Sequence, residues 1–246
     1  MDPASQRAHQ RLELILTKPA EWQSVDELFE RRLLKTSNSA VDFEWITRAN
    51  AEAGLPAIDV SPLQGKFLHL LVQISGAKRV LEIGTLGGYS TAWMASALPE
   101  DGELTTIEIN AAHAGVAAAN LAQAGLTDRV HLRLGDANAI LAEMIRLETS
   151  AFDFVFIDAD KVSGEAYFKS ALELTRPGST IVCDNMVRGG NIIDEDTDDP
   201  DVAGTQRLLG AVAAEPSVSA TAIQTVGQKG HDGFAIMTVE ASSRES

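Results

Sequence analysis

The stretch RVLEIGTLGGYS, residues 79–90, joins a short apolar run to a glycine-rich turn. Its first five residues are bounded by turn residues, which is typical of a buried parallel strand. An apolar pattern at helical spacing follows the glycines and continues to about residue 98. A strand, a glycine turn and a helix in this order predict the first unit of an open parallel sheet, whose ligand site lies at the carboxyl ends of the strands.

Strand and helix patterns alternate along most of the remaining chain. We expect further strands at 103–108, 129–136, 152–158 and 179–185, with helices at 63–76, 111–125, 138–147, 163–174 and 201–214. The last two strand patterns, 217–225 and 233–240, leave no room for a helix between them, so one strand should run antiparallel. The pattern predicts an α/β fold with a seven-stranded, mostly parallel sheet, one antiparallel strand and helices on both faces.

The first sixty residues follow a different pattern. Apolar residues at helical spacing predict helices at 5–17, 22–35 and 42–53, and no strand pattern occurs there. We therefore divide the chain into a helical N-terminal extension or lid, residues 1–57, and a main domain, residues 58–246. The acidic run DEDTDDPD, residues 194–201, should form a loop.

Composition and charge exclude several classes of protein. The chain has 246 residues, 45% of them hydrophobic, and a formal net charge of −15. An acidic surface repels phosphate backbones and anionic lipid heads, so we expect no nucleic-acid partner and no membrane partner. The sequence shows no apolar run near the ~20 residues of a membrane span, no secretory signal, and a single cysteine, Cys183. We expect a cytoplasmic protein.

The glycine turn differs from a dinucleotide-binding turn at one position. Compared with G-x-G-x-x-G, Gly84 and Gly87 match the second and third glycines, whereas Glu82 replaces the first. A carboxylate there is poorly suited to a pyrophosphate and better suited to a cationic ligand. S-adenosylmethionine is such a ligand, since it carries a sulfonium, an ammonium and an adenosine group but no phosphate.

Acidic residues also end the next two strands. Glu108 ends the second strand, where a carboxylate can accept hydrogen bonds from both ribose hydroxyls. Asp136 and Ala137 end the third strand, where the adenine should lie. A glycine turn alone could be a purely structural connection, but acids at three successive strand ends favour cofactor binding.

Oxygen-bearing side chains follow the fourth and fifth strands. Asp158 ends the fourth strand, and Asp184 and Asn185 end the fifth. Adjacent parallel strands bring these ends within side-chain reach. An all-oxygen set without His or Cys selects Mg²⁺, with Ca²⁺ and Mn²⁺ as alternatives. The other interpretation, that these acids cap helices and pair with Lys161, stays open at this point.

Four motifs together resemble those of a known family. They are LEIGTLGGYS at 81–90, IDADK at 157–161, CDN at 183–185 and the closing DGF at 232–234. They look like the motifs of the cation-dependent O-methyltransferases, which include the caffeoyl-CoA and catechol O-methyltransferases. The resemblance implies a seven-stranded, Rossmann-like methyltransferase fold, a homodimer, and S-adenosylmethionine and a divalent cation as cofactors.

The resemblance also implies roles for single residues. It places the methyl donor at Glu82, Gly84, Ser90, Glu108, Ala137 and Asp160, and the cation at Asp158, Asp184 and Asn185. Lys161 and Asp158 would then act in catalysis. We expect methyl transfer to a hydroxyl of a small catechol-type acceptor, an aromatic molecule with two vicinal hydroxyls. Two vicinal oxygens can share one metal ion, which fixes the geometry of attack.

Two other functions fit parts of the sequence. A nicotinamide-dependent oxidoreductase would use a similar sheet, but Glu82 in place of the first glycine argues against it. A non-catalytic module that binds an adenosyl ligand should lack the carboxylates at strands four and five or Lys161, and the chain has both.

Overall fold

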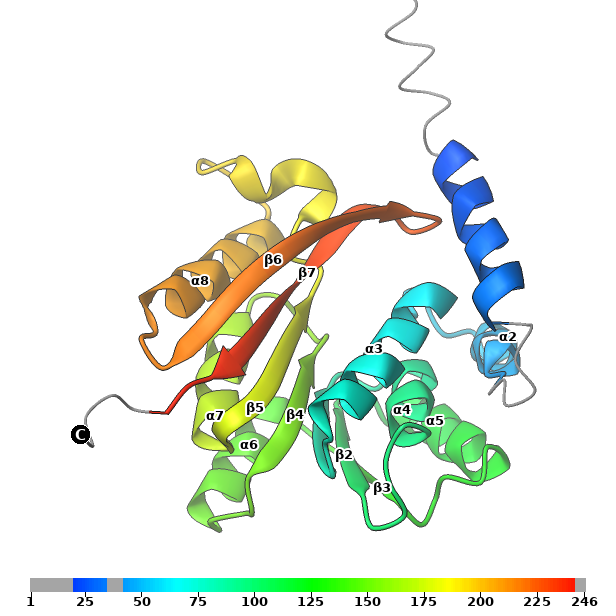
Figure 1. The fold of residues 1–246 in the computed structure, drawn as a ribbon, viewed down its shortest axis with the longest axis horizontal. Coiled ribbons are helices and arrows are strands. Elements are labelled where there is room, and N and C mark those ends of the chain that lie inside the picture. The colour runs from blue at the N-terminus through cyan, green and yellow to red at the C-terminus, as the bar shows by residue number, and fades with distance from the viewer. Residues whose placement is uncertain (1–19, 35–41, 242–246) are drawn as a thin grey trace, which may run out of the picture.

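The computed structural model describes residues 20–34 and 42–241. A seven-stranded sheet in the order β3-β2-β1-β4-β5-β7-β6 runs through the molecule (Figure 1). The strands are β1 (Arg79–Ile83), β2 (Glu103–Glu108), β3 (Val130–Leu134), β4 (Phe152–Ile157), β5 (Thr175–Asp184), β6 (Val218–Gly227) and β7 (Gly230–Val239). Strands β1 to β5 pair in parallel and β7 runs antiparallel to both neighbours, so the predicted sheet is confirmed.

The helices connect the strands and cover both faces of the sheet. Residues 20–29 form an α-helix that continues as a π-helical turn, η1 (Glu30–Leu34). The other segments are α2 (Glu44–Glu52), α3 (Pro62–Ser75), α4 (Tyr89–Ala95), α5 (Ala111–Gln123), α6 (Ala137–Arg146), α7 (Gly164–Glu173), η2 (Arg188–Ile193) and α8 (Pro200–Ala214). Within the described ranges, no helix has the length and apolar character that a membrane span requires.

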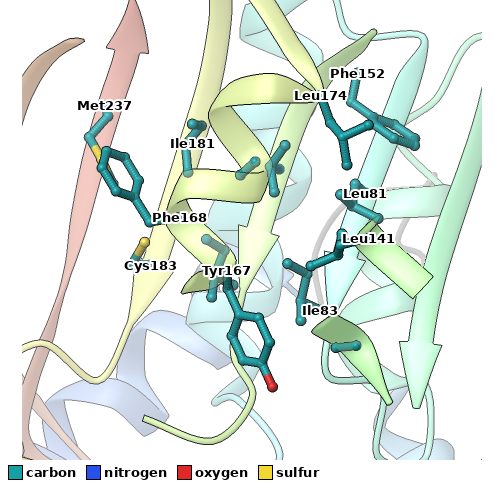
Figure 2. Packing of buried hydrophobic residues seen from close by; sticks show 14 of the residues in the cluster. Leu81, Ile83, Leu141, Phe152, Tyr167, Phe168, Leu174, Ile181, Cys183 and Met237 are labelled. Atoms are coloured by element: carbon teal, nitrogen blue, oxygen red, sulfur yellow. The ribbon is translucent and has the colours of Figure 1, made fainter. Parts of the chain in front are cut away.

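The central strands are apolar because both of their faces are covered. On one face, Leu81 of β1 belongs to a core with Leu141 of α6 and Phe168 of α7 (Figure 2). On the other face, Phe154 of β4 belongs to a second core with Trp93 of α4. These two cores hold β1 and β4 in the middle of the molecule and so fix the positions of their carboxyl ends.

Helix α3 begins and ends at the residues that its capping pattern indicates. The Ser61 hydroxyl oxygen accepts a hydrogen bond from the Gln64 backbone N–H (3.2 Å), and Pro62 occupies the first turn. Gly76 follows the helix in a left-handed conformation, with φ 64°, which glycine adopts without steric penalty. The predicted helix over 63–76 is confirmed to within one residue at each end.

Strand β5 begins earlier than predicted. It starts at Thr175 instead of residue 179, so Pro177 and Gly178 lie within the strand and not at the end of the preceding helix. Strand β7 pairs with β5 only from Thr180 onward. The first residues of β5 therefore form an exposed sheet edge, where proline is tolerated because no backbone N–H is needed on that side.

Two further boundaries differ near the end of the chain. The acidic run is a loop only as far as Asp199, which caps α8 by accepting a hydrogen bond from the Asp201 backbone N–H (2.9 Å). Strands β6 and β7 are longer than predicted, because Gly227 pairs with Gly230 and only two residues connect them. This short turn extends the hairpin to the edge of the sheet where β5 ends.

The expected N-terminal extension divides into segments with different surroundings. The helix expected at 5–17 lies outside the described residues. Helix α2 buries Ile46 and places Asn50 against α5, where Asn120 Nδ2 donates to Asn50 Oδ1 (2.9 Å). The helix of residues 20–34 lies at the rim (Figure 1), where Asp26 Oδ2 accepts a hydrogen bond from the Gln228 backbone N–H (2.8 Å). A domain boundary at residue 57 stays a prediction.

Helix α8 approaches the segment after β4 through a glycine. A Cβ atom at Gly204 would lie 2.2 Å from the backbone oxygen of Lys161, so Gly204→Ala has to displace the helix or that segment. We expect the free energy of unfolding, measured by urea denaturation, to fall by about 1–3 kcal/mol, the usual cost of overpacking.

Gly210→Ala on the same helix is the matched control. Nothing lies within 4 Å of its Cβ position, and alanine favours a helix over glycine by about 1 kcal/mol, so this variant should be unchanged or more stable. Equal losses from the two substitutions would contradict a specific contact between α8 and the segment after β4.

Candidate active site

A cavity of about 580 Å³ opens at the carboxyl ends of the parallel strands. The residues that follow β1 to β4 line it, and the segment before α3 closes one side. The lining includes residues 58–60 and 84–86, with Ser90, Glu108, Asp136, Ala137, Asp158, Asp160, Lys161 and Asn185. The sheet therefore brings together most of the residues that the sequence assigned to a methyl donor, with Glu82 as the exception.

The turn after β1 requires glycine at its first position. Gly84 has φ 101°, a value that residues with a side chain rarely adopt. A Cβ atom there would lie 2.3 Å from the carbonyl oxygen of Asp158. The Asp158 backbone N–H donates to the Ile83 carbonyl oxygen (2.9 Å). The glycine turn and the end of β4 are thus in direct backbone contact.

Glu108 and Asp136 line the part of the cavity at the ends of β2 and β3. Glu108 Oε2 accepts a hydrogen bond from the Leu86 backbone N–H (2.9 Å), which ties the end of β2 to the glycine turn. Asp136 caps α6 by accepting a hydrogen bond from the Ala139 backbone N–H (2.9 Å), and Ala137 follows it in the cavity wall. Both carboxylates lie in the cavity wall, at the strand ends where the sequence expects them.

Glu82 lies beneath the cavity and not in its wall. Its side chain is 0% exposed and accepts hydrogen bonds from the hydroxyls of Ser90 (2.5 Å), Thr106 (2.7 Å) and Thr91. Burial raises the pKa of Glu82 to about 7, and the three hydroxyl donors act in the opposite direction. Glu82 is not among the residues that line the cavity, and its contact with the methyl donor stays a prediction. Glu82 instead holds Ser90, which does line the cavity.

A carboxylate cluster, defined here as Asp158, Asp184 and Asn185, forms where β4 and β5 end. Ile157 of β4 pairs with Cys183 of β5, so the residues that follow them, Asp158 and Asp184, lie side by side at the same edge of the sheet. Asp184 is 7% exposed. Its burial and the nearby charge of Asp158 raise its pKa to about 7. The sheet thus holds two carboxylates close together in a site with little solvent.

Lys161 is the cation beside the carboxylate cluster. Its Nζ atom lies 3.0 Å from Asp158 Oδ1, and its side chain is only 13% exposed. It lines the same cavity as Asp158. The pairing with Lys161 that the sequence left open is therefore present in the structure, and it involves one of the two carboxylates.

Asn185 has its side chain fixed by a residue of β7. Its Nδ2 atom donates to Asp232 Oδ2 (3.1 Å), so the amide oxygen is the atom available to a cation. Asp232 Oδ1 also accepts hydrogen bonds from the backbone N–H groups of Val187 and Arg188 (both 3.1 Å). The sequence marked Asp232 only as part of the closing motif, whereas the structure shows that it supports the cluster.

Asp160 lines the cavity, and its carboxylate already accepts two hydrogen bonds. It accepts hydrogen bonds from the Tyr167 hydroxyl (2.5 Å) and from the Ser163 backbone N–H (2.9 Å). Tyr167 comes from α7 and lines the cavity as well. Sequence reasoning missed Tyr167, because its position in an ordinary amphipathic helix carries no sign of a site.

A second cavity, of about 590 Å³, shares a wall with the first. Asp59, Asn185 and Arg188 line both cavities. The other walls come from α3 and the β6–β7 hairpin, and include the rings of Phe67 and Phe234, whose centroids are 4.8 Å apart. The carboxylate cluster thus borders both cavities, with Asp158 in the wall of the first, Asp184 in the wall of the second and Asn185 in both. The sequence did not identify the second cavity.

Comparisons with known proteins are consistent with this site. The O-methyltransferase family model matches residues 36–235. A catechol O-methyltransferase of Niastella koreensis is 49% identical over 194 residues, which cover 79% of this chain and 88% of that protein. A catechol O-methyltransferase of Mycobacterium tuberculosis is 48% identical over 191 residues, which cover 78% of this chain and 85% of that protein.

Solved structures have the same fold at similar sequence identity. The O-methyltransferase from Bacillus cereus in complex with SAH has a TM-score of 0.86 and 48% identity, over 90% of this chain and 99% of that one. The O-methyltransferase TomG from Streptomyces achromogenes in complex with SAM has a TM-score of 0.85 and 44% identity, over 91% of this chain and 99% of that one. Because the family model covers most of the chain and these relatives approach half identity, the chain belongs to the O-methyltransferase family.

Proposed function

We propose that this chain transfers the methyl group of S-adenosylmethionine to a hydroxyl of a small catechol-type acceptor, assisted by a divalent cation. The observation that carries the proposal is the position of the carboxylate cluster, which borders both cavities. A donor in the first cavity and an acceptor in the second would meet there. The names of the relatives support both ligands, since two are catechol O-methyltransferases and two were solved with SAH or SAM.

The two other functions have less support. Membership of the O-methyltransferase family argues against a nicotinamide-dependent oxidoreductase. A non-catalytic module would not need a buried carboxylate, Asp184, next to the Asp158–Lys161 ion pair at the junction of two cavities. We therefore propose a catalytic function for this chain and not that of a non-catalytic binding module.

The first cavity suits the methyl donor along its length. We propose that Gly84, Ser90, Glu108, Asp136, Ala137 and Asp160 border the donor. Glu108 at the end of β2 can accept hydrogen bonds from ribose hydroxyls, and Asp136 and Ala137 at the end of β3 would border the adenine. The carboxylates in this wall would repel a pyrophosphate and favour a cationic ligand.

The carboxylate cluster fits a hard divalent cation. Asp184 is almost fully buried beside Asp158, and Lys161 pairs with Asp158, so a further positive charge would stabilise both carboxylates. In the part of the chain that the structure describes, no three His, Cys, Asp or Glu residues are placed to hold a metal. The third protein ligand in our proposal is therefore the Asn185 amide oxygen, and the all-oxygen set favours Mg²⁺ over softer metals. When bound, the cation would act as a Lewis acid that lowers the pKa of an acceptor hydroxyl.

Lys161 is the residue of this chain best placed to act on the acceptor hydroxyl. The hydroxyl has to lose its proton, because a neutral phenol is a weak nucleophile. Lys161 Nζ is held at 3.0 Å by Asp158 in a largely buried position. From there it can accept the proton or stabilise the negative charge on the oxygen. Asp158 orients Lys161 in either case.

We also propose that two copies of the chain form a homodimer. The N-terminal helix carries an apolar stripe at helical spacing, Val25, Leu28, Phe29 and Leu33, whose residues are 42–65% exposed. Exposed apolar patches of this kind mark interaction surfaces, and symmetric pairing with a second copy is the commonest way to cover one. The net charge of −15 argues against nucleic acid and anionic membranes as partners, and we place the protein in the cytoplasm.

Metal dependence gives the first test of the proposed function. With S-adenosylmethionine and a catechol, methyl transfer should stop in EDTA and return on addition of excess Mg²⁺. Asp158→Ala and Asp184→Ala should each prevent that return, and calorimetry should show loss of Mg²⁺ binding. Asp196→Ala, which removes an exposed carboxylate of the acidic run, is the control and should respond like the wild type. Full turnover in EDTA would show that the cluster is structural.

Substitution of Lys161 gives the second test. Lys161→Ala should lower the maximal rate by about 10²–10⁴, the range for general acid–base groups, with little change in the affinity for SAH. If Lys161 accepts a proton, Lys161→Arg should not restore activity, since a guanidinium stays protonated. If Lys161 supplies only a fixed positive charge, the arginine variant should recover most of the rate. A near-wild-type rate for Lys161→Ala at saturating substrates would remove Lys161 from the reaction.

The homodimer is tested by sedimentation equilibrium. The wild type should have twice the chain mass of 26.2 kDa. Leu28→Asp should shift the mass toward the monomer, because a charge in an apolar interface is costly to bury. Glu21→Ala, an exposed change on the same helix, should leave the mass unaltered. A wild type that sediments as a monomer at all concentrations would contradict the proposal.

A further inference from the structure

Arg188 is a cation in the wall that the two cavities share. It begins η2, after the end of β5, and it lines both the first cavity and the second. Asn185 of the carboxylate cluster lies only three residues earlier in the chain. None of the four sequence motifs contains Arg188, and the donor and cation sites proposed above make no use of its charge.

A single carboxylate fixes the backbone of Arg188 relative to the carboxylate cluster. Asp232 Oδ2 accepts a hydrogen bond from Asn185 Nδ2 (3.1 Å), and Asp232 Oδ1 accepts one from the Arg188 backbone N–H (3.1 Å). Arg188 has φ 56°, a left-handed value that residues with a side chain rarely adopt, and Gly189 and Gly190 continue the turn with positive φ. The backbone of Arg188 is therefore held at a set position beside the proposed cation site.

The guanidinium of Arg188 has more donors than the protein uses. It carries five N–H groups. Its Nη2 atom donates to Asp201 Oδ2 (3.2 Å), and its Nε atom is buried without a hydrogen-bond partner among the described residues. A buried N–H without a partner is costly, so a small shift of this side chain toward an anion in the cavity would be favourable. A carboxylate fits best, because its two oxygens match the planar fork of a guanidinium.

The acids around Arg188 do not use up its charge. Those that line the second cavity are Asp26, Asp59, Asp184 and Asp232. Each of these either accepts a hydrogen bond from another group or belongs to the carboxylate cluster. In the ion pair with Asp201, the two side chains are 25% and 45% exposed, and partly exposed pairs contribute little stability. Arg188 can therefore bind a ligand carboxylate without giving up a strong contact.

The second cavity has room for a substituent on the acceptor ring. Its volume is about 590 Å³, and the rings of Phe67 and Phe234 offer apolar contact to an aromatic acceptor. If the two hydroxyls of the acceptor bind at the carboxylate cluster, the ring lies in this cavity and a substituent extends to its wall. Lys229, the other cation among the described lining residues, lies on the β6–β7 turn and donates to the Ala57 carbonyl oxygen (3.2 Å). Arg188 is the cation whose backbone is fixed beside the cluster.

We propose that Arg188 selects acceptors that carry a carboxylate, that is, catechols with an acidic substituent on the ring. The inference rests on the proposed function and narrows its substrate class. The Arg188 guanidinium binds the carboxylate, while the carboxylate cluster and its cation hold the two hydroxyls. Arg188 takes no part in methyl transfer itself, so its contribution belongs to KM more than to kcat.

The test compares two acceptors of similar shape that differ in charge. 3,4-Dihydroxybenzoate carries a carboxylate, and 3,4-dihydroxybenzyl alcohol carries a neutral group at the same ring position. In Arg188→Gln, the ratio of kcat/KM for the benzoate to kcat/KM for the alcohol should fall roughly 10–100-fold, the range for a hydrogen bond to a charged group. The fall should come mainly from KM. Arg188→Lys should give an intermediate ratio, since it keeps the charge but not the planar fork.

Two further variants sharpen the comparison. Asp201→Asn removes the carboxylate that competes for Arg188, so the same ratio should rise above that of the wild type. Arg207→Gln is the matched control, because it makes the same substitution at an exposed arginine of α8 that lines neither cavity. Its ratio should equal that of the wild type. Melting curves and SAH affinity, measured for each variant, show whether the fold and the first cavity are intact.

The outcomes separate this inference from the proposed function. An unchanged ratio in a folded Arg188→Gln would overturn the role of Arg188 while methyl transfer stands. Equal losses for the two acceptors together with weaker SAH binding would assign Arg188 to the donor and contradict the inference. So would a fall in the ratio with Lys229→Gln in place of Arg188→Gln.

If Arg188→Gln does not fold, the ratios of Arg188→Lys and Asp201→Asn decide, since the inference requires one to fall and the other to rise. If the wild-type chain methylates neither acceptor in the presence of Mg²⁺, the proposed function fails and this inference fails with it.

Discussion

The close backbone contact between Gly84 and Asp158 is the constraint on which the site depends. A side chain at Gly84 would overlap the Asp158 carbonyl oxygen, so the turn after β1 and the end of β4 can approach only because this residue is glycine. The contact sets the distance between the wall of the first cavity and the carboxylate cluster. Backbone atoms within two buried strands fix that distance, and it therefore does not depend on the rotamers of exposed side chains.

Glu82 supports the same turn from below. A buried carboxylate is costly unless its oxygens are hydrogen-bonded, and here hydroxyls from α4 and β2 surround it. Thr85 adds a further link, since its hydroxyl lies 2.5 Å from that of Thr106. The acid that led us from the sequence to a cationic ligand thus links the start of α4 to β2 beneath the cavity.

The sequence allowed most of the sheet to be predicted, because buried parallel strands read as short apolar runs between turn residues. Glu108, Asp136, Asp158 and Asp184 could be placed together because the carboxyl ends of parallel strands meet at one edge. Asp59, Phe67 and Arg188 could not, since they come from a loop, a helix and a turn whose approach depends on tertiary packing. The start of β5 could not be predicted either. Pro177-Gly178 normally ends a helix or strand, whereas here it lies within β5 on an exposed edge of the sheet.

The antiparallel strand decides which of the two cavities the β6–β7 hairpin reaches. Because β7 runs antiparallel to β5, the two-residue turn of the β6–β7 hairpin reaches the edge of the sheet where the parallel strands have their carboxyl ends. It lines the second cavity and leaves the first untouched. Surface loops accept insertions at a small cost in loop-closure entropy. Lengthening this one turn would therefore reshape the second cavity, where we propose the acceptor, without changing the strands that end at the first cavity, where we propose the methyl donor.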